Sequence, residues 1–258
     1  MSDLPQPQEP RRQPDPDMAA EARAEPSAVM YRPAGRLAGS VALIANGESG
    51  LGRAVALGFA REGADVAITY FDQHGDAEET VRLIEAEGRQ AVAIPGDIGN
   101  SDFAREVVRQ TVAAFGRIDV LVNNAVEQSV DQRLEELSDV QLERTFRLNV
   151  FSQFFLTRSA LSEMRVGSAV VNTVLATAQV SGKAGVDHAS GKGAAIAFTR
   201  ALSDQLADRR IRVNAVAVRS ALDAFEDVLP GYVFLATREA AYFSGQVLHP
   251  RGGEVAEG

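Results

Sequence analysis

The fold is decided by the stretch VALIANGESGLGRAVALGFAREGADVAITY, residues 41–70. The short apolar run at 41–45 has the composition of a strand that is covered on both faces. A glycine-bearing turn over 46–52 leads into a predicted helix over 53–62, and the next strand is predicted over 65–70. The stretch therefore predicts a complete βαβ unit with two parallel strands.

The same alternation of helical segments and apolar runs continues to the end of the chain. Further helices are predicted over 77–87, 103–115, 138–164, 190–208 and 232–237, and further strands over 91–94, 120–123, 169–173, 212–216 and 246–248. Ser138 is predicted to cap the helix that follows it, with Gln141 as its capping-box partner. This regular alternation predicts a single-domain, Rossmann-like α/β fold, a doubly wound parallel sheet flanked by helices.

The segment before this domain has a different composition. Residues 1–35 hold seven of the ten prolines, with Arg, Glu, Asp and Gln between them. Such a segment cannot bury a core, so it is predicted to be a disordered or extended arm, and residues 36–258 are predicted to form the domain. A flexible leader is one interpretation of the arm, and contact with a neighbouring subunit is the other.

The composition excludes several classes of function. A net charge of −9 argues against nucleic acid and anionic membranes as partners, which leaves a small-molecule substrate. The absence of cysteine excludes disulfides, thiolate catalysis and Cys-based zinc sites, and three scattered histidines give no metal site. No run reaches the roughly 18 apolar residues of a membrane span. With no signal peptide at its start, the protein is expected to be cytoplasmic.

The turn after the first strand is the first candidate binding site. Gly50 and Gly52 allow the backbone to come close to a pyrophosphate at a helix N-terminus. A tight strand-to-helix connection without a ligand is the alternative. Because the turn lies inside a full βαβ unit, nucleotide binding is the favoured interpretation.

A set of motifs in a fixed order carries a family resemblance. The motifs are the glycine turn, Gly96-Asp97-Ile98, Asn123-Asn124-Ala125, Asn149, Lys192, Arg212-Val213-Asn214-Ala215 and Gly245-Gln246-Val247-Leu248. With them, the chain from Leu37 to its end resembles the short-chain dehydrogenase/reductase family, single-domain Rossmann oxidoreductases, and most of all the subgroup with a leader rich in Pro and Gln. The resemblance implies a cofactor site formed by Asn46, Gly50, Leu51, Gly52, Tyr70, Asp97, Ile98, Asn123 and Lys192.

The turn departs from the family pattern T-G-x-x-x-G-x-G, because Ala45 and Asn46 replace its Thr and first Gly. Asn tolerates a left-handed backbone best among non-glycine residues, so we expect the loop to keep its shape with nucleotide binding weakened or lost. The acid that holds the ribose of NAD at the end of the second strand is replaced by Tyr70, with Asp72 two residues on. The turn carries Glu48 and no Arg or Lys for a 2′-phosphate, so NAD(H) is expected rather than NADP.

The catalytic positions depart further. In the family a Tyr donates a proton, a Lys four residues later lowers its pKa, a Ser thirteen residues before the Tyr holds the substrate oxygen, and an Asn on the preceding helix completes the group. Asn149 and Lys192 match these spacings, whereas His188 replaces the Tyr and Leu175 replaces the Ser. The resemblance thus implies a catalytic group of His188, Lys192 and Asn149.

Each replacement leaves an alternative open. Leu175 cannot donate a hydrogen bond and is expected to pack in the cleft floor, unless Thr173, Thr177 or Ser181 substitutes for the serine. Imidazole transfers protons near neutral pH, so His188 is either catalytic or a buried structural histidine. Losing a placed general acid typically costs roughly 10²–10⁴ in rate.

The substrate lid of the family is also shortened. The Pro-Gly that follows the Asn-Ala strand in the family is replaced by Val218-Arg219, and only fourteen residues, 218–231, separate Ala217 from Tyr232. Arg219, Asp223 and Phe225 are expected at the mouth of the cleft. The pocket is therefore expected to be open, or closed by the arm or a partner subunit.

Three functions remain open at this point. The first is a repurposed enzyme with conventional reduction weak or lost, which uses His188 and Lys192 for a non-redox step such as cyclisation, dehydration or isomerisation. The second is an atypical NAD(H)-dependent oxidoreductase, and the third is a non-catalytic nucleotide-binding or structural subunit. A homodimer or homotetramer is expected, with the apolar residues Val150-Phe151 and Phe154-Phe155-Leu156 at the interface or packed within the subunit.

Overall fold

The computed structural model describes residues 32–124, 133–175, 185–218 and 225–250. The chain separates into two units, Met1–Tyr31 and Arg32–Gly258, and most of the predicted arm lies outside the described residues. The end of the arm does not match its predicted boundary. Ala34 donates its backbone N–H to the buried carboxylate of Glu62 at 3.1 Å, so the folded domain begins before residue 36.

The described strands form one seven-stranded sheet in the order β3-β2-β1-β4-β5-β6-β7. All neighbouring strands are parallel. The strands are β1 (Val41–Ile44), β2 (Asp65–Tyr70), β3 (Ala91–Pro95), β4 (Val120–Asn123), β5 (Ala169–Leu175), β6 (Arg212–Val218) and β7 (Val247–Leu248). The strand order reverses between β1 and β4, which opens a crevice at the carboxyl ends of these two strands.

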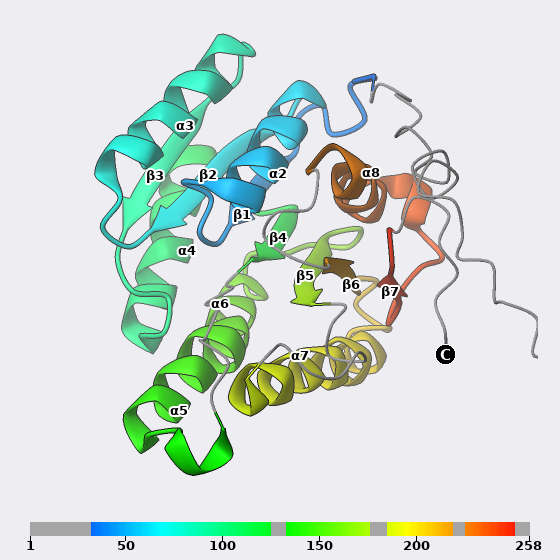
Figure 1. Ribbon diagram of the computed structural model, residues 1–258. Coiled ribbons are helices and arrows are strands. Elements are labelled where there is room, and N and C mark those ends of the chain that lie inside the picture. The colour runs from blue at the N-terminus through cyan, green and yellow to red at the C-terminus, as the bar shows by residue number, and fades with distance from the viewer. Residues whose placement is uncertain (1–31, 125–132, 176–184, 219–224, 251–258) are drawn as a thin grey trace, which may run out of the picture. The chain divides into compact units, whose positions relative to one another are not determined.

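Helices cover both faces of the sheet, which confirms the predicted doubly wound fold (Figure 1). One face carries α2 (Gly50–Arg61), α3 (His74–Ala86) and α8 (Phe225–Ala236), and the other carries α4 (Ser101–Phe115), α5 (Asp139–Phe146), α6 (Ser152–Ala160) and α7 (Val186–Gln205), with short 3₁₀ turns η1 (Leu134–Glu136) and η4 (Arg238–Ala240). On the second face, Leu43, Leu121 and Val170 of the strands pack with Val107 of α4 and Leu156 of α6. All five are almost fully buried, as expected for strands covered on both faces.

The helix predicted over 138–164 is divided by a π-helical segment, η2 (Arg147–Phe151), and its last turn ends at Ala160. A π turn frees carbonyl groups from the regular ladder. Two side chains from the start of α6 donate to carbonyls of this segment: Ser152 to that of Leu148, and Gln153 to that of Asn149 at 2.9 Å. Apolar periodicity alone does not reveal this local widening.

The start of α5 agrees with the sequence prediction in its cap, whereas the start of α8 differs from it. The Ser138 hydroxyl caps α5 as predicted, accepting from the backbone N–H of Gln141 at 3.2 Å, while the Gln141 side chain donates to Thr145. Helix α8 begins at Phe225, so the second half of the predicted lid region, residues 225–231, is helical. Pro230 lies inside this helix, and the sequence pattern had located only the part after it.

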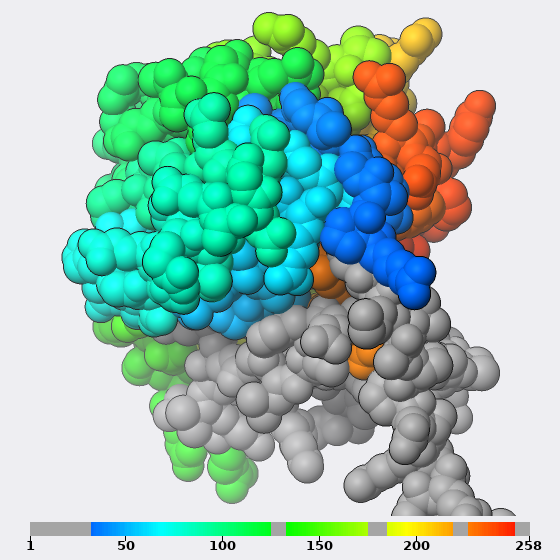
Figure 2. All heavy atoms as spheres, turned by 90° about the horizontal axis from the view of Figure 1, so that it is seen from above, coloured from blue at the N-terminus to red at the C-terminus, as the bar shows by residue number. Residues whose placement is uncertain are grey.

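The segment from Arg32 to β1 runs along the surface between two parts of the domain. In Figure 2 it is the blue band between the cyan helices and the orange-red C-terminal segment. Arg36 explains this path, because its guanidinium reaches Glu62 at 2.5 Å and Glu239 of η4 at 4.0 Å. The segment thereby ties the end of α2 to the turn that follows α8.

Candidate active site

The turn between β1 and α2 keeps a tight shape with asparagine in the place of a glycine. Asn46 adopts a left-handed backbone with φ +50°, as does Gly50 with φ +52°. The Asn46 N–H donates to the Thr69 hydroxyl at 3.0 Å, and the side chain of Asn124 donates to the Asn46 carbonyl at 3.4 Å. Polar groups from β2 and from the end of β4 therefore hold the residue that departs from the family pattern.

Glycine at the start of α2 is required by this turn. A Cβ on Gly52 would lie 2.0 Å from the Asn46 carbonyl oxygen and 2.9 Å from the Asn124 amide nitrogen. Gly50, the half-buried Leu51 and Gly52 form the first turn of α2, with Ser49 as its N-cap. The predicted binding residues of the turn are thus together at a helix N-terminus, where backbone N–H groups favour an anion.

A cavity of about 640 Å³ opens beside this turn. Three of the predicted residues, Asn46, Asp97 and Ile98, line it. The Asp97 carboxylate also accepts the Gly99 N–H at 2.8 Å, which fixes the loop after β3. The remaining lining residues are Glu48, Phe71, Gln73, Gly96, Val140, Glu143, Arg144, Arg147 and Leu148.

Two predicted cofactor residues have side chains committed to other contacts. The Tyr70 hydroxyl is 2.9 Å from Nδ1 of His74, and it is Phe71 and Gln73 that line the cavity. The Asn123 amide donates to Asn172 at 2.8 Å and to Thr157 at 3.0 Å, between β5 and α6. Sequence reasoning missed the next residue, Asn124, which contacts the turn; the repeated Asn in the motif was the available signal.

The other candidate residues lie on α7. His188 and Lys192 are one helical turn apart, so they share a face of the helix. Their exposed fractions are 3% and 0%. Burial lowers the pKa of the Lys192 ammonium to about 8 from its usual 10.5. Near neutral pH this helix therefore presents a lysine close to its titration point beside an imidazole.

Asn149 lies in the π segment that packs against this part of α7. A Cβ on Gly191 would lie 3.5 Å from Cβ of Asn149 and 3.6 Å from Val150, so the two segments approach closely through a glycine. The Thr145 hydroxyl donates to the buried carboxylate of Asp187 at 2.7 Å, which links α5 to the start of α7. The structure thus brings the Asn149 segment to the helix of His188 and Lys192.

Of the three residues that could substitute for the missing serine, the structure describes only Thr173. Leu175 is the last residue of β5 and pairs with Val218, but its side chain, like Thr177 and Ser181, lies outside the described part of the protein. The Thr173 hydroxyl lies 2.7 Å from the Tyr232 hydroxyl of α8 and donates to Asn124 at 3.1 Å. Because α8 and α7 cover opposite faces of the sheet (Figure 1), Thr173 does not substitute beside Lys192.

The structure also gives the positions of some residues that were predicted at the cleft mouth and at the subunit interface. Arg219 and Asp223 lie outside the described residues, and Phe225 begins α8. Of the apolar residues after Asn149, Val150 and Leu156 are buried within the subunit, whereas Phe151 and Phe154 are exposed. Intramolecular packing therefore accounts for only part of this apolar run.

The described residues hold neither a cluster of metal ligands nor a helix that could span a membrane. Across 32–124, 133–175, 185–218 and 225–250, no three His, Asp or Glu side chains gather to hold a metal ion. Over those ranges, too, every helix is too short or too polar to cross a bilayer.

Comparisons with known proteins identify a family and agree with the fold. A family model described as short chain dehydrogenase matches residues 40–221. An NADPH-dependent aldehyde reductase 1 from Arabidopsis thaliana is 41% identical, with 94% of this chain and 96% of that protein covered. A glucose and ribitol dehydrogenase from Daucus carota is also 41% identical, with 88% and 89% covered. A short chain dehydrogenase from Burkholderia cenocepacia, solved in complex with NADP, superposes with a TM-score of 0.79 at 31% identity, covering 84% of this chain and 98% of that one.

Proposed function

Because the chain belongs to the short-chain dehydrogenase/reductase family, we propose that it binds a nicotinamide dinucleotide and acts on a small metabolite that carries a carbonyl or hydroxyl group. Conventional carbonyl reduction is weak or lost in this proposal. His188 and Lys192 instead serve a non-redox proton transfer, as in a cyclisation, dehydration or isomerisation.

The turn and the adjacent cavity fit a dinucleotide. Glycine at position 52 lets the start of α2 lie directly against the Asn46 carbonyl, and Asn46 keeps the turn in its left-handed shape. The residues that would hold the adenosine end are Asp97 and Ile98, and the start of α2 would hold the phosphates. Lys192 would hold the ribose at the nicotinamide end. A nicotinamide dinucleotide supplies a hydride acceptor or donor when it is bound.

The pair on α7 is the observation that carries the proposed chemistry. A carbonyl oxygen needs a proton when a hydride is added, and neutral imidazole is a weaker acid than imidazolium. His188 is almost fully buried and lies one helical turn before Lys192 on α7. Neutral imidazole is suited to accept a proton from a carbon or hydroxyl group, while the Lys192 ammonium stabilises the negative charge that develops.

An atypical oxidoreductase is the second candidate. It is supported by the family and by relatives named as an aldehyde reductase and a sugar and polyol dehydrogenase. In this case binding and orientation carry a slow hydride transfer. The names of the Arabidopsis and Burkholderia proteins point to NADPH and NADP, whereas the turn of this chain points to NAD(H), so both nucleotides are needed in any test.

Proton exchange separates the two candidates. The protein with NAD⁺ or NADP⁺ bound is incubated in D₂O with a panel of small aldehydes and ketones, and deuterium entry beside the carbonyl is followed by NMR. The proposal predicts exchange that falls roughly 10²-fold or more in His188→Ala and is unchanged in His249→Gln, a histidine after β7. Ketone reduction by NADH or NADPH without exchange would favour the oxidoreductase instead.

The exposed phenylalanines support a homo-oligomer. Phe151 and Phe154 lie on consecutive turns of η2 and α6, and the Phe154 ring packs against Phe198 of α7 with centroids 4.4 Å apart. A second copy would cover them. Light scattering is expected to show a dimer or tetramer that Phe154→Glu weakens, while a monomeric wild type would contradict the assignment.

A further inference from the structure

We propose that Glu48, from the glycine turn, recognises the adenosine ribose hydroxyls of the dinucleotide and disfavours a 2′-phosphate. This inference rests on the proposed function, because it concerns the nucleotide end of that site. It moves the selecting carboxylate from the end of β2, where the sequence has Tyr70, to the turn after β1.

The backbone places Glu48 beside the end of β2. The N–H of Gly47, the residue before it, donates to the Thr69 carbonyl at 3.0 Å. A Cβ on Gly47 would lie 2.5 Å from Cγ2 of Ile68, so the turn lies against this strand as closely as glycine permits. The Glu48 side chain therefore starts from a backbone position beside the end of β2, close to where an acid on that strand would act.

The Glu48 side chain is poised toward a ligand. It is only 8% exposed, it lines the cavity with Asp97 and Ile98, and its Oε2 atom has no hydrogen-bond partner among the described residues. A buried acceptor without a donor is costly, and two ribose hydroxyl groups are donors of suitable chemistry. Burial raises the pKa of the carboxyl, and Asp76 and Asp72 add to this effect.

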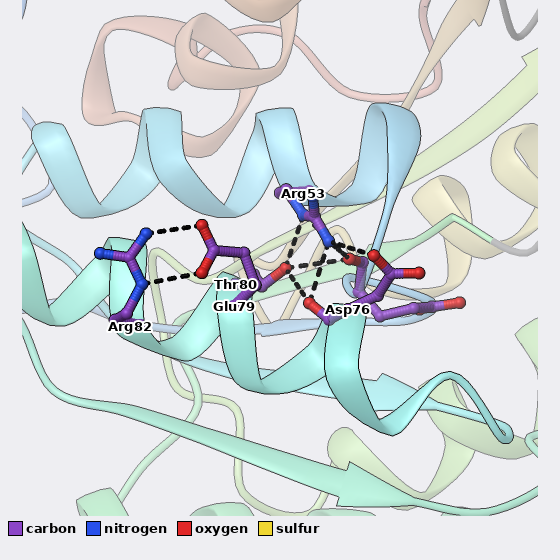
Figure 3. A network of polar contacts seen from close by, with 6 residues as sticks. Arg53, Asp76, Glu79, Thr80 and Arg82 are labelled. Atoms are coloured by element: carbon purple, nitrogen blue, oxygen red, sulfur yellow. Dashed lines mark hydrogen bonds and ion pairs between the residues drawn. The ribbon is translucent and has the colours of Figure 1, made fainter.

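Arg53, close to the turn on α2, is engaged by contacts with the turn and with α3 and does not line the cavity. The Arg53 guanidinium donates to the Glu48 backbone carbonyl at 2.6 and 2.9 Å, to Thr80 at 2.8 Å and to Asp76 at 3.0 Å. Figure 3 shows Arg53 reaching from α2 to Asp76 and Thr80 on α3. These bonds hold the Glu48 backbone in place and leave Arg53 on the α3 side, away from a 2′-phosphate.

Two arginines that could attract a 2′-phosphate, Arg144 and Arg147, also line the cavity. Arg147 is paired with Glu143 at 2.7 Å. A ribose hydroxyl donates to the Glu48 carboxylate, whereas a 2′-phosphate brings a second anion to the same buried place. Glutamine would keep an acceptor oxygen and remove the repulsion, so it separates charge from hydrogen bonding.

Calorimetric titration of the full chain with ADP-ribose and 2′-phospho-ADP-ribose tests this assignment without catalysis. The wild type is expected to bind ADP-ribose at least about tenfold more tightly, a difference of about 1.4 kcal/mol. Glu48→Gln is expected to reduce this ratio by about tenfold, chiefly through tighter binding of the phosphorylated ligand. Glu79→Gln removes the same charge from an α3 residue that bonds to Arg82 outside the cavity, and is expected to leave the ratio unchanged.

The titrations distinguish a wrong role for Glu48 from the absence of a dinucleotide site. If both ligands bind and Glu48→Gln leaves their ratio as in the wild type, the role of Glu48 is wrong while the dinucleotide site stands. If neither ligand binds to the wild type, the dinucleotide site and the role of Glu48 both fail. Urea unfolding of each variant shows whether it is folded, and Glu48→Ser provides a second uncharged variant at the same position.

Discussion

The two halves of the site depart from their family in different ways. In the β1–α2 turn, Asn46 replaces a glycine, yet it takes the left-handed backbone that the position requires. At the end of β5 and on α7, Leu175 and His188 replace a hydroxyl and a phenol. The first kind of change is absorbed because the turn needs a backbone shape. We propose that the second kind of change is not absorbed, because proton donation needs particular atoms at a particular reach.

Hydrogen bonding reinforces this contrast. The turn is held by Thr69 and Asn124, and Asn124 in turn is linked through Thr173 to the buried Tyr232 of α8. The catalytic side retains Lys192 and the Asn149 segment, but it lacks the Tyr and Ser beside which these residues act in the family. We therefore expect perturbations of the turn to act on stability and nucleotide binding, and perturbations of α7 to act on ionisation and chemistry.

The largest effect is expected from Gly52→Ala, which breaks the turn itself. A Cβ there would overlap the Asn46 carbonyl oxygen, so the turn must move. We expect a loss of about 3 kcal/mol in urea unfolding and loss of NADH and NADPH binding by fluorescence. Gly75→Ala, at an open helical position of α3, is the matched control and should stay within about 1 kcal/mol. Unchanged stability and binding in Gly52→Ala would show that the turn is not tight.

The second effect concerns Lys192 on the catalytic side. It is measured as the pH dependence of the unfolding free energy. The Lys192 pKa is about 8 when folded and near 10.5 when unfolded. The unfolded chain therefore binds more protons between these values, and stability rises with pH in this window. Relative to Lys192→Met, the wild type should gain about 2–3 kcal/mol in unfolding free energy from pH 7 to 10. Parallel stability curves for the two proteins would contradict the burial of a charged lysine.

The third effect concerns the hydrogen-bonded chain beneath the turn. Tyr232→Phe removes a buried hydroxyl that lies 2.7 Å from the Thr173 hydroxyl, and should cost about 1–1.5 kcal/mol in thermal or urea unfolding. Tyr242→Phe is the control, because Tyr242 is 100% exposed and should change stability by less than about 0.5 kcal/mol. Equal effects of the two substitutions would mean that the buried chain contributes nothing measurable.

The smallest effect tests whether Asn46 has kept the glycine geometry. Asn46→Gly should stay within about 0.5 kcal/mol of the wild type, whereas Asn46→Ala should cost about 1 kcal/mol because of the left-handed φ. Arg210 has φ +53° outside the site, so Arg210→Ala is the control that should affect stability alone. If Asn46→Gly lost both stability and nucleotide binding, the Asn46 side chain would have a role beyond shape.

The sequence predicted the fold well because strand burial and helix ends follow from local patterns. Strands β2 and β4 have the predicted bounds, and every predicted element is present. The π segment around Asn149 and the early start of α8 across Pro230 were missed, since each depends on contacts with distant residues. The apolar periodicity of the sequence does not depend on such contacts and so cannot predict them.

The site was predicted less completely, and for a related reason. The family resemblance pointed to Asp97 and Ile98, which line the cavity, and its spacings pointed to His188 and Lys192. The helix predicted to start at residue 190 starts at Val186, so it carries both of these residues. It assigned the ribose end to Tyr70, whose hydroxyl is instead beside His74. The direction of a side chain depends on what packs around it, so position in a motif predicted where a backbone lies better than what its side chain contacts.

We propose that the chain keeps a nucleotide site and lacks the groups that protonate a carbonyl oxygen. The most direct test measures the rate at which NADH or NADPH reduces a simple ketone, for the wild type and for the Leu175→Ser, His188→Tyr double variant, with nucleotide binding to each protein confirmed first. We predict that the double variant is at least about 10²-fold faster than the wild type. A wild type as fast as the double variant, or a double variant that binds the nucleotide and gains nothing, would contradict the claim.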